Sequence, residues 1–400
     1  MKKSLLLLWI ICVPVMVAGQ STYDDILRAV SLSERGEAEE AATLLGGLTT
    51  IGSDAGMLLL RGDIYLKAGR INDARRDFMT AENLQHGSGI YGLARCAAAE
   101  GDARAATAWL ETHLKSPQRK SEPEILLDNS FKSLSSSTEW KNLWKKDWYK
   151  GYERKSWEIE QYLKAGRTEM AVESWEDLKA VYPDMPVTDY CEARILMNKG
   201  KYSEAAGILA KLTSDSDAPA QWKYTLAEAY AGAGSYYAAA STYGKLIDAG
   251  YPDPRLLISR SRMLIRAGDR DAAKHDLQRY LSIDPDDTAA LGLIGKTYAE
   301  EGAIYEALPY LNANVEKHPG EASAYTLRGD AWMAARSWDK ATEDYSMSLD
   351  LNPGDGAVNL NLGIALVNTG KTDEACYYLR KAKAMGEKDA TQYLAKYCIK

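Results

Sequence analysis

Two short motifs in this sequence could bind a ligand in the right structural setting. The stretch GSGIYG, residues 87–92, has the glycine spacing of loops that hold the pyrophosphate of a dinucleotide. The tripeptide Arg-Gly-Asp, which can support cell adhesion when it stands in an exposed loop, occurs twice, within LRGD at residues 60–63 and 327–330. A motif works only in its proper context, so the surrounding elements decide what each of these stretches does.

Residues that could catalyse a reaction or hold a metal are sparse. The chain has four histidines, His86, His113, His275 and His318, and their spacing is not that of metal ligands. It contains no nucleophile elbow, no phosphate-binding loop and no Cys-x-x-Cys pair. The sequence therefore predicts a non-catalytic protein without a cofactor or metal. An enzyme whose site is assembled from distant residues stays an alternative that a motif search does not test.

Both LRGD copies continue into the same sequence frame. An Ala stands twelve residues after each Gly, at Ala74 and Ala341, and an aromatic residue stands sixteen after, at Phe78 and Tyr345. A shared frame of this length indicates an internal structural repeat.

The repeat has a period of 34 residues over most of the chain. Counted from the start of each unit, the twentieth place is Ala in all ten units, and the fifteenth is Gly in nine, with Arg336 the exception. The eighth place is small in nine units, and four prolines share place 32. The units start at Thr22, Ala55, Gly87, Tyr152, Pro186, Ala220, Pro254, Thr288, Ala322 and Gly356.

Each of these preferences has a physical cause. Apolar residues at helical spacing on both sides of the Gly predict two amphipathic helices in each unit, here called the first and second helix. Gly ends the first helix because it adopts a left-handed conformation without steric cost. Small residues at places eight and twenty allow the two helices to cross closely, and Pro at place 32 stops the second helix.

A 34-residue helix pair with these residues at these places resembles the tetratricopeptide repeat. The resemblance covers nearly the whole chain after residue 19 and implies an all-α, right-handed α-solenoid of about ten helix pairs, with one degenerate helix pair and a C-terminal capping helix. In this frame Gly62 and Gly329 lie inside first helices, so the LRGD copies are interpreted as part of the repeat and not as adhesion sites. GSGIYG follows a second helix and is interpreted as a turn between units.

The first nineteen residues are predicted to be a secretory signal peptide. Lys2 and Lys3 precede an apolar stretch, and small residues follow it at 17–19. No later stretch is apolar enough for a transmembrane helix. We therefore expect an exported protein, with the periplasm of a bacterium favoured and a secreted or surface-associated location as alternatives.

The repeat pattern also predicts the domain organisation. Residues 119–151 lack the Gly and Ala of places fifteen and twenty although their length is one period, so they are interpreted as a degenerate, tryptophan-rich helical unit. The predicted parts are a signal peptide at 1–19, an N-terminal array of three repeats at 20–118, the degenerate unit at 119–151, a C-terminal array of seven repeats at 152–389, and a capping helix at 390–400.

The resemblance implies that first helices line a concave groove, with places two, five, six, nine, twelve and thirteen facing inward. Aromatic and charged residues at these places suit a peptide ligand, which needs both apolar contacts and hydrogen-bond partners. Arg255, Arg262 and Arg266 would suit an acidic or carboxylate group in particular. A solvated helix face is the alternative interpretation of the charges at place nine. The candidate groove residues are Tyr91, Arg95, Tyr190, Arg194, Tyr224, Glu228, Arg255, Arg262, Arg266 and Lys296.

The four cysteines after the predicted signal peptide divide into two cases. Cys96 and Cys191 fall in units too far apart to bridge and are expected to be buried apolar residues. Cys376 and Cys398 could form a disulfide if the last segment folds back on the final repeat, and a pair of free thiols is equally compatible with the sequence.

Three tryptophans in the degenerate unit, Trp140, Trp144 and Trp148, recur every fourth residue and share one helix face. We favour a packed joint between the two arrays. The alternative is an exposed aromatic platform, extending to Trp157, that binds a glycan or a surface complex.

These observations favour a protein-interaction scaffold of the cell envelope whose partners are other proteins or peptides. A net charge of −7 argues against a nucleic-acid binder, which needs a basic surface. A lumenal co-chaperone of a secretory pathway is a further alternative, although the sequence has neither a J-type His-Pro-Asp motif nor a retention tail.

Overall fold

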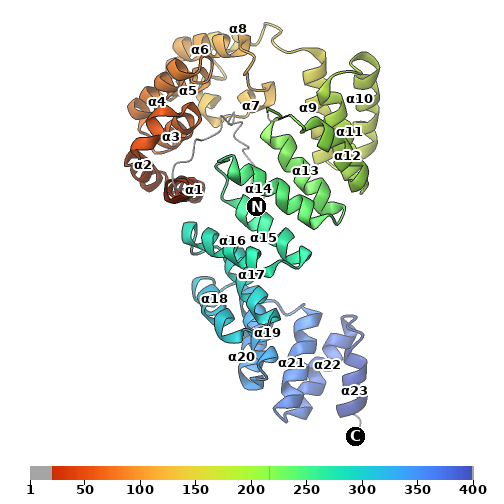
Figure 1. The fold of residues 1–400 in the computed structure, drawn as a ribbon. Coiled ribbons are helices and arrows are strands. Elements are labelled where there is room, and N and C mark those ends of the chain that lie inside the picture. Colours follow the sequence, from red (N-terminus) through yellow and green to blue (C-terminus); the bar gives the residue numbers. More distant parts are fainter. Residues whose placement is uncertain (1–19, 216, 399–400) are drawn as a thin grey trace. The chain divides into compact units, whose positions relative to one another are not determined.

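The computed structural model describes residues 20–215 and 217–398. The predicted signal peptide therefore lies outside the described residues. All regular secondary structure in the described part is helical, as Figure 1 shows. Over the same residues, no helix combines the length and the apolar character that crossing a membrane would require. The all-α expectation is confirmed.

The chain divides into two compact units, the first ending at Met263 and the second beginning at Leu264. Unit 1 contains α1 (Gln20–Arg35), α2 (Ala38–Gly46), η1 (Thr49–Ser53), α3 (Ala55–Lys67), α4 (Ile71–Leu84), α5 (Ile90–Ala99), α6 (Ala103–Lys115), α7 (Glu122–Leu126), η2 (Asn129–Leu134), α8 (Thr138–Leu143), α9 (Gly151–Lys164), α10 (Thr168–Val181), α11 (Pro186–Asn198), α12 (Tyr202–Leu212), α13 (Ala220–Gly232), α14 (Tyr236–Asp248) and most of α15 (Arg255–Ala267).

Unit 2 holds the remaining helices: α16 (Arg270–Ile283), α17 (Thr288–Glu300), α18 (Ile304–Lys317), α19 (Ala322–Ala334), α20 (Trp338–Leu351), α21 (Gly356–Asn368), α22 (Thr372–Ala384) and α23 (Ala390–Tyr397). In both units the helices follow the repeat frame. The four second helices that precede a place-32 proline, α10, α16, α18 and α20, each end two residues before it.

The two helices of a repeat pack closely because small residues stand where they cross. The place-twenty alanines have no solvent exposure in any of the ten repeats. At place eight, a Cβ atom added to Gly62 would lie 2.6 Å from Phe78, and one added to Gly329 would lie 2.8 Å from Tyr345. Any larger side chain at these places would push the second helix away.

Place fifteen requires a left-handed backbone at the end of the first helix. The glycines at this place have positive φ angles, and Arg336, the one residue there that is not Gly, is forced to a φ of 56°. Left-handed geometry costs a residue with a Cβ atom roughly 1–2 kcal/mol. Arg336 therefore shows that the repeat geometry, and not the residue, sets this conformation.

Replacing Arg336 with Gly should raise the free energy of unfolding by about 1 kcal/mol, because Gly adopts positive φ without steric cost. Chemical unfolding followed by circular dichroism measures the change. Gly302→Ala, at the same place of the preceding repeat with φ of 78°, is the matched control and should lower stability by a similar amount. An unchanged midpoint for Arg336→Gly would contradict this account.

Residues 119–151 differ from the expected degenerate helix pair. They form the short segments α7, η2 and α8, whose first turns are capped by the side chains of Ser121, Asp128 and Ser137. Three N-cap residues within seventeen positions each start a new helix, so no long helix can form. The unit keeps the length of a repeat and loses its shape.

This tryptophan-rich segment is packed into the core and is not a platform. Trp140 is 8% exposed, and Trp144, Trp148 and Trp157 are partly buried against the same cluster, which includes Phe131. The Nε1–H of Trp148 donates a hydrogen bond to the Leu143 carbonyl oxygen at 2.9 Å. The proposed glycan-binding surface therefore lacks the exposed indoles that it needs.

The same core holds a buried histidine, His113, which is 3% exposed. Its Nε2 atom accepts a hydrogen bond from the backbone N–H of Lys120 at 2.8 Å, which joins α6 to the 119–151 segment. Burial, with smaller contributions from Lys120 and Arg119, lowers the pKa of His113 to about 4. The folded protein therefore keeps this imidazole neutral.

We expect the chain to lose stability in mild acid through His113. The unfolded chain takes up this proton near pH 6.5 and the folded chain only near pH 4, so stability falls as pH falls through that window. Between pH 8 and pH 5 the loss should be about 2 kcal/mol. His113→Gln keeps an acceptor for Lys120 and should flatten this dependence, which urea unfolding at the two pH values would measure. Equal pH slopes for the two proteins would contradict the assignment.

The C-terminal helix α23 covers the last repeat. Ala390 is fully buried against Leu379 and Ala382 of α22. The structure joins Cys376 and Cys398 in a disulfide with a Cα–Cα distance of 5.7 Å, so the end of α23 is covalently fixed to α22. Cys96 and Cys191 are free and buried.

Candidate functional site

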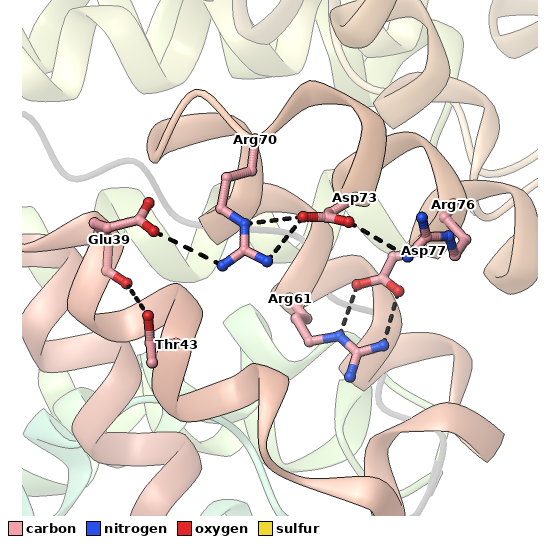
Figure 2. Close-up of polar contacts among 7 residues, drawn as sticks. All are labelled: Glu39, Thr43, Arg61, Arg70, Asp73, Arg76 and Asp77. Atoms are coloured by element: carbon pink, nitrogen blue, oxygen red, sulfur yellow. Dashed lines mark hydrogen bonds and ion pairs between the residues drawn. The ribbon is translucent and has the colours of Figure 1, made fainter.

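The two LRGD copies use their charges inside the protein. Arg61 on α3 donates two hydrogen bonds to the carboxylate of Asp77 on α4, at 2.7 and 2.8 Å (Figure 2). Arg328 on α19 makes the same pair with Asp344 on α20, at 2.9 and 2.7 Å. Bidentate pairs of this kind hold both helices of a repeat in one register. The adhesion interpretation is excluded, because each tripeptide lies within a helix with its Gly against an aromatic ring.

Figure 2 also shows more exposed charged side chains near the Arg61–Asp77 pair. Arg70 reaches Asp73 of its own repeat and Glu39 of the preceding one, and Arg76 contacts Asp73 from the other side. These side chains are much more exposed than Asp77, whose side chain is 6% exposed. Exposed pairs contribute little to stability, so the Arg61–Asp77 pair is the one that matters here.

Arg61→Met should lower the free energy of unfolding by about 3 kcal/mol, because it leaves the buried Asp77 carboxylate without its partner. Arg61→Met combined with Asp77→Leu should recover most of that loss, since no unpaired charge remains. Arg76→Met, which removes an exposed arginine of α4, is the control and should change stability by less than about 0.5 kcal/mol. Chemical unfolding measures these changes. Equal losses of stability for Arg61→Met and Arg76→Met would show that burial of the Arg61–Asp77 pair is unimportant.

The tyrosines at place five are more buried than we expect of residues that contact a ligand in the groove. Tyr91 is 9% exposed, its hydroxyl donates to Asp128 at 2.7 Å, and burial raises its pKa. It is a core residue that contacts the 119–151 segment, so its assignment to the groove is wrong. Tyr190 is partly buried and stacks on Trp222 with ring centroids 5.2 Å apart. Tyr224 is partly buried and packs edge-on against Tyr243.

Most place-nine charges of unit 1 pair with the same place of the next repeat. Arg95 on α5 forms an ion pair with Asp63 on α3 and also contacts Asp128 at 3.4 Å. Arg194 on α11 donates to both oxygens of Glu160 on α9, at 3.0 and 3.2 Å. The alternation of sign along the sequence therefore reflects contacts between neighbouring first helices. Both arginines were predicted as groove residues, and each has its charge paired within the chain.

The three arginines proposed for a carboxylate ligand all lie on α15 and differ in their surroundings. Arg255 is held by Asp253 through two hydrogen bonds of 2.8 and 3.0 Å, and it lies 3.7 Å from Glu34 of α1. Arg262 is exposed near the end of unit 1, and Arg266 is exposed in unit 2. Lys296, also in unit 2, is exposed and lies 3.8 Å from Glu300 of its own helix.

A cleft in unit 1 brings together two of the predicted residues, Arg194 and Glu228. It has a volume of about 510 Å³ and lies across the C-terminal halves of the first helices α9, α11 and α13. Its remaining lining residues stand mainly at places twelve and thirteen, which the family pattern assigns to the inner face. They are Leu163, Lys164, Met197, Asn198, Tyr202 and Gly232.

The sequence reasoning missed these six lining residues because it weighed charge and aromaticity at places five and nine. The available signal was positional, since five of the six follow from the frame at places twelve and thirteen alone. Asn198 and Lys164 are exposed, and Leu163 is buried. The cleft therefore combines apolar side chains with polar and charged ones, and a peptide ligand can use both.

Glu228 differs from the other charged residues of the cleft. It is partly buried, and in the described part of the chain neither a hydrogen bond nor an ion pair reaches its carboxylate. Burial raises its pKa, although the nearby positive charge of Arg194 opposes this. Within the described residues there is no cluster of three His, Cys, Asp or Glu side chains suited to a metal ion.

Comparison with protein families identifies the repeat. A family model described as tetratricopeptide repeat matches residues 190–254, 260–322, 304–356 and 326–390. These matches follow the frame that the helices and the buried alanines show. The chain belongs to the tetratricopeptide-repeat family. The cleft at α9, α11 and α13 lies on first helices of this repeat.

Individual similar proteins are distant. The chain is 25% identical over 130 residues to the BBSome complex member bbs-4 of Caenorhabditis elegans, which covers 32% of this chain and 28% of that relative's length. A tetratricopeptide repeat protein from Parabacteroides merdae is 18% identical with a TM-score of 0.49, over 62% of this chain and 98% of that one. The APC/C hetero-tetramer Cut9-Hcn1 is 16% identical with a TM-score of 0.46, over 93% and 83% of the two chains.

Proposed function

We propose that this protein is a non-catalytic scaffold of the cell envelope that binds peptide segments of partner proteins in the groove of its first helices. The observation that carries the proposal is the cleft across α9, α11 and α13, where apolar walls and an unpaired carboxylate face the same space. Tetratricopeptide repeats bind other proteins, and rigid stacked repeats present a long surface for that purpose.

The envelope location is supported by features at both ends of the chain. The N-terminal sequence has the basic start, apolar stretch and small residues of an export signal. The disulfide between Cys376 and Cys398 fits an oxidising compartment, where such bonds persist. We therefore place the protein in the periplasm of a bacterium, where it would assemble or present other envelope proteins.

Photo-crosslinking in intact cells tests this function. A photoreactive residue at Lys164 or Asn198, on the rim of the cleft, should give discrete protein adducts. The control is Tyr237, which is 62% exposed on the second helix α14 and lies outside the cleft lining. Adducts at the cleft alone would support the groove, and adducts in the fraction released from the periplasm would support the location.

Two outcomes would contradict the proposal. Equal adducts at Asn198 and Tyr237 would show that the groove is not the binding surface. Adducts confined to the cytoplasmic fraction would leave the groove in place and overturn the envelope location.

A further inference from the structure

In unit 1, ion pairs join place-nine residues of neighbouring repeats, but none of these pairs includes Glu228. In the repeats before it, a place-nine carboxylate faces a place-nine arginine, as in Asp63 with Arg95 and Glu160 with Arg194. Glu228 is the next residue in this series, on α13. Glu160 accepts hydrogen bonds from Nε and one terminal nitrogen of Arg194, and within the described residues no hydrogen bond joins Arg194 to Glu228.

The position of Glu228 makes an unpaired carboxylate costly. It is partly buried, and Tyr224, Tyr243 and Arg194 lie near it. Withdrawal of an ionised carboxylate from water lowers stability unless a partner compensates it. The other unpaired charge of the cleft, Lys164, is exposed at the rim, where water solvates it at no such cost.

The shape of the cleft suggests which partner would compensate Glu228. Leu163, Met197 and the Tyr202 ring supply apolar lining, and Asn198 supplies an exposed amide. A lysine or arginine side chain has an apolar stem that such a lining can cover and a charged end that can reach a carboxylate. A volume of about 510 Å³ also leaves room for the residues beside it in a peptide.

We propose that the groove selects peptides with a lysine or arginine side chain, which inserts between Leu163, Met197 and Tyr202 and forms an ion pair with Glu228. This inference rests on the proposed function, because it names the chemistry of the segment that the groove binds. It is opposite in sign to the acidic ligand that the arginines of the 254 repeat suggest. Arg262 stands at place nine of the next repeat but forms no ion pair with Glu228 in the described residues, so the partner peptide supplies the cation at this point.

A displayed library of random octapeptides, selected in parallel against the full chain and its Glu228→Gln variant, tests the proposal. The wild-type protein should enrich peptides with Lys or Arg at one fixed position. A synthetic peptide from that selection should bind Glu228→Gln about thirtyfold more weakly than wild type, as expected for loss of a buried charged partner. Glu228→Gln is nearly isosteric and removes an unpaired charge, so its thermal midpoint should not fall.

A second peptide completes a double-mutant cycle between the basic residue of the peptide and Glu228. The same sequence with norleucine in place of the basic residue should lose as much affinity for wild type and should bind wild type and Glu228→Gln equally. Glu176→Gln, which removes an exposed carboxylate of α10 outside the cleft lining, is the matched control and should change the affinity by less than about threefold.

The outcomes separate this inference from the function on which it rests. Enriched peptides without a basic residue that still crosslink at Asn198 would overturn the cation site and leave the groove as a peptide-binding surface. Equal affinity for wild type and Glu228→Gln would do the same. If neither protein enriches any peptide, both the inference and the peptide-binding function are wrong.

Discussion

The close crossing of two helices within each repeat is the constraint on which the rest of this structure depends. It is made possible by alanines with no solvent exposure at place twenty and by small residues at place eight, against which Phe78 and Tyr345 pack directly. Because the separation of the two helices is fixed, each repeat has nearly the same shape, and first helices follow one another along one face. The cleft at α9, α11 and α13 exists because this face continues from repeat to repeat.

Charge in this protein serves two purposes that the structure separates. Arg61 with Asp77, and Arg328 with Asp344, join the two helices of one repeat, whereas Glu160 with Arg194 joins neighbouring repeats. Both kinds of pair satisfy their charges internally and rigidify the array. Glu228 also stands at place nine, but it has no such partner. It therefore departs from the pattern of internal pairs and differs from an ordinary surface charge.

The last repeat and the irregular segment 119–151 are stabilised by different interactions. The last repeat is covered by α23, which the Cys376–Cys398 disulfide fixes in place. In the middle, residues 119–151 lack the residues that make a repeat and fold as short capped helices around Phe131 and Trp140. The aromatic side chains there belong to one buried cluster with residues of α5 and α6, so the core of the preceding repeat continues into the irregular segment.

The sequence by itself determined the helix pairs, their boundaries and the buried alanines, because these follow from local periodicity and from steric limits at single places such as Arg336. It also located the two cysteines that the structure joins, without deciding that they pair. Only the tertiary structure decided which groove residues are available. Tyr91 and Arg194 have the right types at the right places, yet each is taken by a partner some 34 to 37 residues away in the chain. Hydrogen-bond partners across repeats depend on rotamers and distances that residue type does not encode, and for that reason Glu228 could be recognised as unpaired only in the folded chain.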